Sequence, residues 1–141
     1  MLDIKITKTT HPKEKPQDES KLGFGKKFSD HMFLMDYTAG EGWHDARIVP
    51  YAPIPMDPGA VALHYAQETF EGLKAYTTES GDIVRFRPDQ NAKRMYDSAQ
   101  RLEMPPFPKD KFVEAVKQVV SANAAWVPPF GSGATLYVRP F

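Results

Sequence analysis

Alternating apolar and polar positions predict two β-hairpins in this chain. Residues 31–37 form a short apolar and aromatic run, residues 38–42 contain two glycines typical of a turn, and residues 43–51 form a second run. Residues 73–76 and 83–87 alternate in the same way on either side of a turn that contains a glycine. Each pair of runs is therefore expected to form two antiparallel strands.

Apolar residues at helical spacing predict two long helices in the second half of the chain. The first is expected to begin at Pro88 and to end before the paired prolines 105–106, because proline suits the first turn of a helix and cannot continue one. The second is expected over residues 110–124, with Asp110 as its N-cap. A shorter helix is expected around residues 63–70, just before the second hairpin.

The two ends of the chain differ in character. Residues 1–21 are polar and contain two prolines, so we expect an arm there and regular structure from about Leu22. Residues 134–141 have the alternation of a last strand, so the chain stops inside an apparent structural element and a longer protein is expected. Hairpins followed by two helices and a strand predict an α+β domain over residues 22–141, with a mainly antiparallel sheet and two long helices.

Composition and charge narrow the classes of function. The 141 residues include 18 basic and 18 acidic side chains, so the excess positive charge that would attract nucleic acid or an anionic membrane is missing. The absence of cysteine excludes disulfides, thiolate metal sites and cysteine nucleophiles. The N-terminus does not resemble a signal peptide, and no apolar run approaches the roughly 20 residues of a spanning helix. A cytoplasmic protein without nucleic-acid or membrane partners is expected.

Spacing alone assigns no chemistry, because glycine-rich phosphate loops, His-Glu-x-x-His pairs and metal-like carboxylate clusters are all missing from the sequence. Four ordered blocks nevertheless resemble branched-chain amino acid aminotransferases, which are fold type IV enzymes dependent on pyridoxal 5′-phosphate. The resemblance covers about residues 22–141. The blocks are FG with FSDHM (24–32), LHYAQETFEGLKAY (63–76), FRPDQNAKRM with SAQRL and MP (86–105), and WVP with LYVRP (126–140).

This resemblance implies a small N-terminal domain that packs against a larger one, with the cofactor between them and with two subunits in a homodimer. The full-length enzyme would transfer the amino group of leucine, isoleucine or valine to 2-oxoglutarate. Its catalytic lysine would lie in the large domain, beyond Phe141. Lys74 does not match that lysine, so no residue of this chain is assigned a catalytic role and the chain alone is expected to be inactive.

The resemblance also assigns binding roles to six residues. Arg94 would bind the cofactor phosphate, and a planar guanidinium suits that group because it can donate paired charge-assisted hydrogen bonds. Without the resemblance, Arg94 would be interpreted as a surface residue paired with Asp97. Arg139 would support the substrate carboxylate, or alternatively form a structural ion pair. The hydrophobic pocket for the substrate side chain would be shaped by Phe24, Tyr65, Phe70 and Tyr137, with Tyr65 acting across the dimer.

Two kinds of alternative function remain open. A D-amino acid aminotransferase or an aminodeoxychorismate lyase would share the fold, although neither is expected to carry the FEGLKA block together with LYVRP. A noncatalytic interaction module would use the aromatic residues as a partner surface. No metal site is expected, because His31 and His64 each lack a second ligand at metal spacing and are expected to serve hydrogen bonding or packing.

Overall fold

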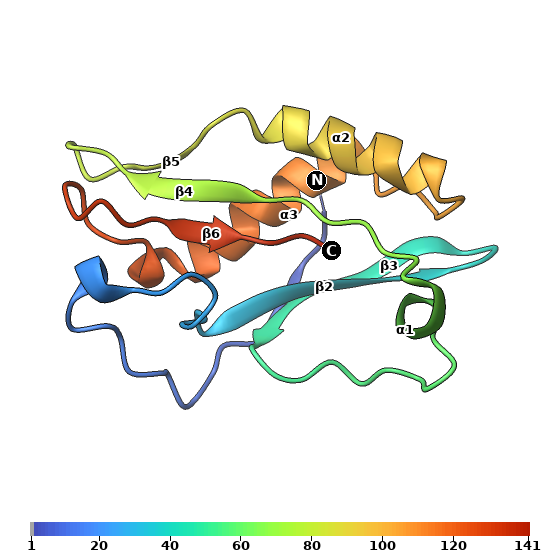
Figure 1. The fold of residues 1–141 in the computed structure, drawn as a ribbon, viewed down its shortest axis with the longest axis horizontal. Helices are drawn as coiled ribbons and strands as arrows, with labels where there is room; N and C mark the ends of the chain where they lie inside the picture. Colours follow the sequence, from blue (N-terminus) through green and yellow to red (C-terminus); the bar gives the residue numbers. More distant parts are fainter. Residues whose placement is uncertain (1) are drawn as a thin grey trace.

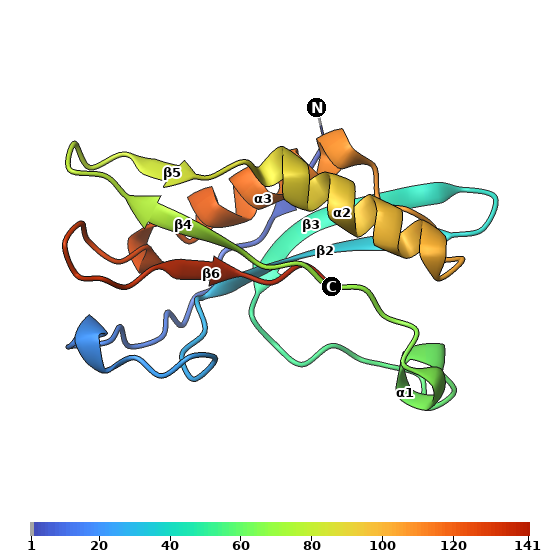
Figure 2. The ribbon, with the colours of Figure 1, turned by 45° about the horizontal axis from the view of Figure 1, so that its top comes forward.

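The computed structural model describes residues 2–141, and for residue 20 the backbone only. It contains two three-stranded sheets and three α-helices, which confirms the predicted α+β class. Figures 1 and 2 show the two sheets and the two long helices in two views of the molecule. The elements in chain order are β1 (Lys5–Ile6), η1 (Glu19–Lys21), β2 (His31–Thr38), β3 (Gly42–Pro50), α1 (Val61–Tyr65), β4 (Leu73–Thr77), β5 (Ile83–Arg85), α2 (Pro88–Arg101), α3 (Lys109–Ala122), η2 (Ala124–Trp126) and β6 (Leu136–Val138).

The first sheet has the strand order β1-β3-β2. β2 and β3 form the predicted antiparallel hairpin, with His31 opposite Pro50 and Thr38 opposite Gly42. β1 adds to β3 in parallel, with Lys5 opposite Arg47. The expectation that regular structure starts near Leu22 is therefore wrong, because the polar arm supplies a strand through its backbone. The division into an arm and a domain remains a prediction.

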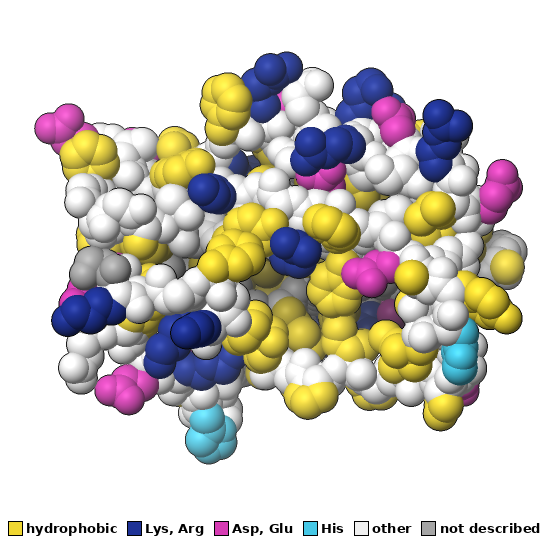
Figure 3. All heavy atoms as spheres, viewed as in Figure 1, with side chains coloured by type: hydrophobic (Ala, Val, Ile, Leu, Met, Phe, Trp, Pro, Cys, Tyr) yellow, Lys and Arg dark blue, Asp and Glu magenta, His cyan; other side chains and the backbone are white. Residues whose placement is uncertain are grey.

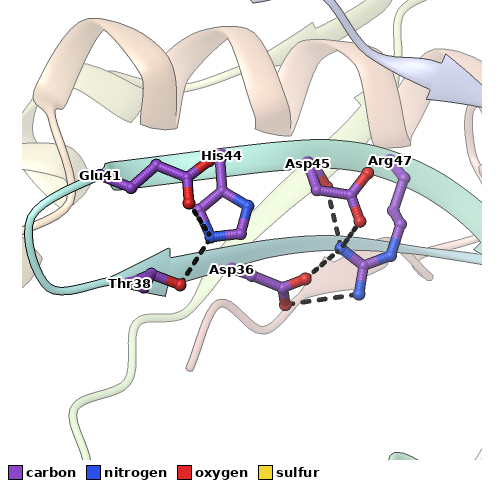
Figure 4. Close-up of polar contacts among 6 residues, drawn as sticks. All are labelled: Asp36, Thr38, Glu41, His44, Asp45 and Arg47. Atoms are coloured by element: carbon purple, nitrogen blue, oxygen red, sulfur yellow. Dashed lines mark hydrogen bonds and ion pairs between the residues drawn. The ribbon is translucent and has the colours of Figure 1, made fainter.

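Polar side chains cross-link the surface of this hairpin beside a register shift in its ladder (Figure 4). Arg47 donates from Nη1 to Asp36 Oδ2 at 2.8 Å and lies 3.0 Å from Asp45 Oδ2. The ring of His44 lies 2.9 Å from the hydroxyl of Thr38. Ion pairs at such exposed positions contribute about 0–1 kcal/mol each, so these contacts add little to the stability of the domain.

The second sheet has the strand order β5-β4-β6 and is antiparallel throughout. Helices α2 and α3 cover one of its faces (Figures 1 and 2). The buried cluster between them combines strand residues with helix residues, because each element turns one apolar side inward. Its buried members are Leu73, Ala75, Ala92, Phe112, Val116 and Val120.

Two sets of contacts join the first sheet to the helical layer. At one end, the Trp43 ring packs edge-on against Phe107 at 4.9 Å, and its Nε1 donates to the Pro106 carbonyl. At the other end, buried Asn123 brackets the backbone of His31, accepting from its N–H at 3.0 Å and donating to its carbonyl at 3.1 Å. The Asn123 side chain thus pairs the His31 N–H and supplies a donor to the His31 carbonyl, which also lies 3.5 Å from the Ser29 hydroxyl.

Two local predictions about helices need correction. α1 spans only Val61–Tyr65, because Ala66 adopts a left-handed conformation with φ of 51° and ends the helix before Phe70. Asp110 is not an N-cap, since α3 begins one residue earlier after Pro108 and has no side-chain cap hydrogen bond. Among residues 2–141, no helix is long and apolar enough to cross a membrane.

Asn123 offers a test of how the two layers are joined. Replacing it with alanine removes three hydrogen bonds, among them the acceptor of the His31 N–H, so we expect Asn123→Ala to lower the free energy of unfolding by about 1–3 kcal/mol. Urea unfolding measures this change. Lys117→Ala, at an exposed position of α3, the helix that Asn123 follows, is the control. Equal stability of the two variants would contradict the role given to Asn123.

Candidate functional site

β4 separates the core from an open face. Successive strand residues point to opposite sides of a sheet, and Leu73 and Ala75 are accordingly buried against the helices. Lys74 and Tyr76 lie on the opposite, exposed face. In the view of Figure 3, hydrophobic side chains gather across the middle of the molecule. The open face of this sheet carries the aromatic part of the candidate site, whereas Arg94 lies on α2.

Four of the five residues predicted to bind substrate come together at this face. Tyr137 on β6 is paired in register with Lys74. The ring of Phe24 packs edge-on against Tyr137, with 5.1 Å between ring centroids. Arg139 donates from Nη2 to the Tyr137 hydroxyl at 2.9 Å, and its guanidinium carbon lies 4.5 Å from the ring centroid of Phe70. The cluster combines apolar rings with one cation and one hydroxyl, and Arg139 forms no ion pair among the described residues.

Tyr65 lies apart from this cluster. It is the last residue of α1, and the residue is 83% exposed to solvent. Among the described residues, no contact joins it to the other five candidates. Figures 1 and 2 both show α1 away from β6. A role for Tyr65 in the pocket of a second subunit remains a prediction.

Gly72 lets Tyr137 lie directly over the backbone at the start of β4. A Cβ atom at position 72 would fall 2.0 Å from the Tyr137 hydroxyl oxygen and 2.8 Å from the ring carbon that carries it. Such distances are far below van der Waals contact, so any side chain here would push the tyrosine away. The small residue is required by the neighbouring ring.

Arg94 lies on α2 and is held by a buried carboxylate. Its Nε and Nη2 donate to the two oxygens of Glu71, the second bond measuring 2.7 Å. Glu71 is 2% exposed, whereas the Arg94 side chain is 69% exposed. The alternative that Arg94 pairs with Asp97 is wrong, because Asp97 pairs with Lys93 at 2.6 Å.

The carboxylate of Glu71 is ionised despite its burial. Burial by itself raises the pKa of this group, but hydrogen bonds from Arg94, Asn91 and the Gly72 N–H, together with the Arg94 charge, bring the pKa below its ordinary value of 4.5. The hydrogen bond to Glu71 and the charge of its carboxylate raise the pKa of Arg94. The pair is therefore charged on both sides at neutral pH.

Adjacent residues connect the arginine to the aromatic cluster. Glu71 contacts Arg94, and Gly72, next in sequence, contacts Tyr137. The Glu71 N–H donates to the Pro140 carbonyl at 2.9 Å, so the start of β4 is also fixed to the segment that carries the cluster. The solvent-facing side of Arg94 borders a shallow depression of about 230 Å³ lined by Phe86, Arg87, Gln90, Asn91 and Arg94.

Three further titratable side chains are candidates from the sequence, namely Lys74, His31 and His64. Lys74 is exposed, so the burial that would make its amine nucleophilic is missing. His31 Nε2 accepts from the Thr9 N–H at 3.0 Å, and His64 Nε2 lies 2.6 Å from the Pro58 carbonyl. Within residues 2–141 there is no group of three or more His, Cys, Asp or Glu side chains placed to hold a metal ion.

The chain is similar over nearly its whole length to aminotransferases. The relatives are branched-chain aminotransferases: the enzyme of Mycolicibacterium smegmatis is 48% identical over 99% of this chain, and branched-chain-amino-acid transaminase 1 of Bacillus subtilis is 51% identical over 98% of it. The predicted resemblance is confirmed. The chain spans 38–39% of the length of these relatives. No family model matches the chain.

Sequence reasoning did not single out Glu71, Gly72 or Asn91. All three lie inside the blocks that carry the resemblance, but their roles depend on contacts between β4, α2 and β6. The available signal was an acidic residue followed by glycine directly before a strand with one buried face, since both types are unusual there without a specific partner.

Gly72 gives the first test of this site. We expect Gly72→Ala to displace Tyr137 and to lower the free energy of unfolding by about 1–3 kcal/mol, as overpacking does. Urea unfolding measures the change. In a Tyr137→Phe background the cost should be smaller, because the closest atom, the hydroxyl oxygen, is gone. The same cost in both backgrounds would contradict the contact.

The ionised Glu71 gives a second test, through the pH dependence of stability. A carboxylate with a lowered folded-state pKa stabilises the fold above its unfolded pKa, here near 4.5, and this contribution disappears as pH falls through the folded pKa. The loss of stability in Glu71→Gln should therefore be largest above pH 4.5 and shrink below it. Unfolding midpoints across pH 3–7 measure the difference, with Glu79→Gln in the exposed turn as control. A difference independent of pH would contradict ionic pairing.

Proposed function

We propose that this chain is the small N-terminal domain of a branched-chain amino acid aminotransferase. The observation that supports it most directly is that two adjacent residues contact both parts of the site. Glu71 holds the solvent-facing guanidinium of Arg94, and Gly72 contacts Tyr137 of the aromatic cluster. The whole protein would transfer the amino group of leucine, isoleucine or valine to 2-oxoglutarate. The relatives named above are branched-chain aminotransferases, and the chain matches about two fifths of their length.

The cofactor of this proposal is pyridoxal 5′-phosphate, and Arg94 fits its phosphate group. One edge of the guanidinium is bound to Glu71, while the side chain as a whole is 69% exposed beside the depression on α2. A guanidinium held in this way can donate its outward N–H groups to a phosphate without first giving up side-chain freedom. When bound, the cofactor supplies an electron sink for the carbon that loses its proton.

The aromatic cluster fits a branched aliphatic side chain beside a carboxylate. The rings of Phe24, Phe70 and Tyr137 supply apolar surface, and burying such surface drives the binding of an aliphatic group. Arg139 supplies a cation whose position is fixed by its bond to Tyr137 and by its place over Phe70. In this proposal it attracts the substrate carboxylate, and Tyr65 closes the pocket of the second subunit of a homodimer.

The catalytic lysine would come from a part of the protein outside this chain. Lys74 is exposed on the open face of β4, so we assign it no covalent role. The cytoplasm is the proposed location, since a chain without cysteine suits a reducing compartment. Residues 1–141 alone would then be inactive.

Transamination by the whole protein tests the proposal. We expect turnover of leucine, isoleucine and valine with 2-oxoglutarate, and no turnover by residues 1–141 alone. Amino-acid consumption and glutamate formation are the measurements. Turnover of D-amino acids or of aminodeoxychorismate without turnover of these three would contradict the assignment. So would stoichiometric covalent attachment of pyridoxal phosphate to Lys74, detected by mass spectrometry after reduction.

A further inference from the structure

Glu71 is the most completely satisfied charged side chain in the site. Its two oxygens accept from Arg94 Nε, Arg94 Nη2, Asn91 Nδ2 at 2.8 Å and the Gly72 N–H at 3.3 Å. The residue is 2% exposed. A carboxylate so enclosed cannot touch a ligand in the depression, so any effect on binding must pass through a neighbour.

Glu71 itself is fixed by α2 and by the segment after β6. Asn91 on α2 donates to the Glu71 carboxylate and also to the Gly72 carbonyl at 3.2 Å. The Glu71 backbone N–H donates to Pro140 after β6. The carboxylate is thus held by residues that do not depend on Arg94, and it can act as a rigid support for the guanidinium.

We propose that Glu71 is a positioning residue that holds the Arg94 guanidinium with its free N–H groups directed outward, ready for a phosphate. The inference rests on the proposed function, because it takes the phosphate of pyridoxal 5′-phosphate as the ligand. Glu71 binds the Nε and one Nη2 hydrogen of Arg94, which leaves the donors on the other edge of the fork for the anion.

Charge and geometry make opposite predictions for this residue. If net charge alone mattered, removing the Glu71 anion would strengthen phosphate binding, because a negative charge that repels the phosphate would disappear. If positioning matters more, its removal would weaken binding, because a long exposed arginine would have to be ordered by the ligand itself. The direction of the effect therefore separates the two explanations.

The experiment uses the whole protein and two probes, pyridoxal 5′-phosphate and pyridoxal, which lacks the phosphate. We expect Glu71→Gln to weaken binding of pyridoxal 5′-phosphate about tenfold, the usual scale for a residue that orients a ligand-binding group, and to leave the dissociation constant of pyridoxal unchanged. Asp97→Asn breaks the ion pair between Asp97 and Lys93 on α2 and should change the dissociation constant of neither probe. Tighter or unchanged pyridoxal phosphate binding by Glu71→Gln would overturn the inference.

Arg94→Ala separates this inference from the proposed function. If Arg94→Ala fails to weaken pyridoxal phosphate relative to pyridoxal, the cofactor assignment is wrong. If Arg94→Ala weakens it and Glu71→Gln does not, only the positioning role is wrong. In the Arg94→Ala background, Glu71→Gln should cause no further loss of preference for the phosphorylated probe, and an additive loss would overturn an action through Arg94.

A second variant covers the case in which Glu71→Gln does not fold. Arg94→Lys keeps a cation but cannot make two parallel bonds to the carboxylate. Positioning predicts that it loses the preference for pyridoxal 5′-phosphate over pyridoxal by about tenfold. A lysine variant that keeps the full preference would show that the charge alone suffices, and the inference would be overturned.

Discussion

The alternation of side chains along β4 is the constraint from which the site follows. Leu73 and Ala75 must be apolar and small enough to pack under the two long helices, which commits Gly72, Lys74 and Tyr76 to the other face. A shift of one residue in register would exchange the two sets. The strand is also central in its sheet, bonded on both sides, so its register is fixed by β5 and β6 together.

Glu71 and Gly72 occupy the point where this strand begins, and they serve opposite needs. The carboxylate lies inward, where only paired charges are tolerated, and this requires Arg94 and Asn91 on α2. The glycine makes room for a ring that approaches its backbone from β6. Two neighbouring residues thus connect the Arg94 guanidinium to an apolar surface.

Periodicity in the sequence predicted the elements that are long enough for their apolar positions to repeat. Both hairpins, both long helices and the last strand are confirmed. β1 escaped prediction because it spans two residues and joins the sheet through backbone bonds to a distant strand, which leaves no local pattern. The end of α1 depends on one residue, Ala66, in a left-handed conformation that no composition rule marks.

The candidate site was predictable by resemblance and not by spacing. Phe24, Phe70, Tyr137 and Arg139 are separated by up to 115 positions (24 to 139). They meet because β4 and β6 are neighbours and because the loop after η1 places Phe24 against Tyr137. Local reasoning paired Arg94 with Asp97, the acid within one helical turn. The structure pairs it with an acid 23 positions away, because burial between layers outweighs nearness in sequence.

The short first strand has a consequence for how the protein can be handled. β1 covers one edge of β3 with backbone bonds, and the Thr7 N–H extends that coverage by donating to Ile48 at 2.9 Å. An uncovered strand edge can pair with another chain. Cleavage of the first ten or so residues would therefore open a template for aggregation, although it removes nothing from the candidate site.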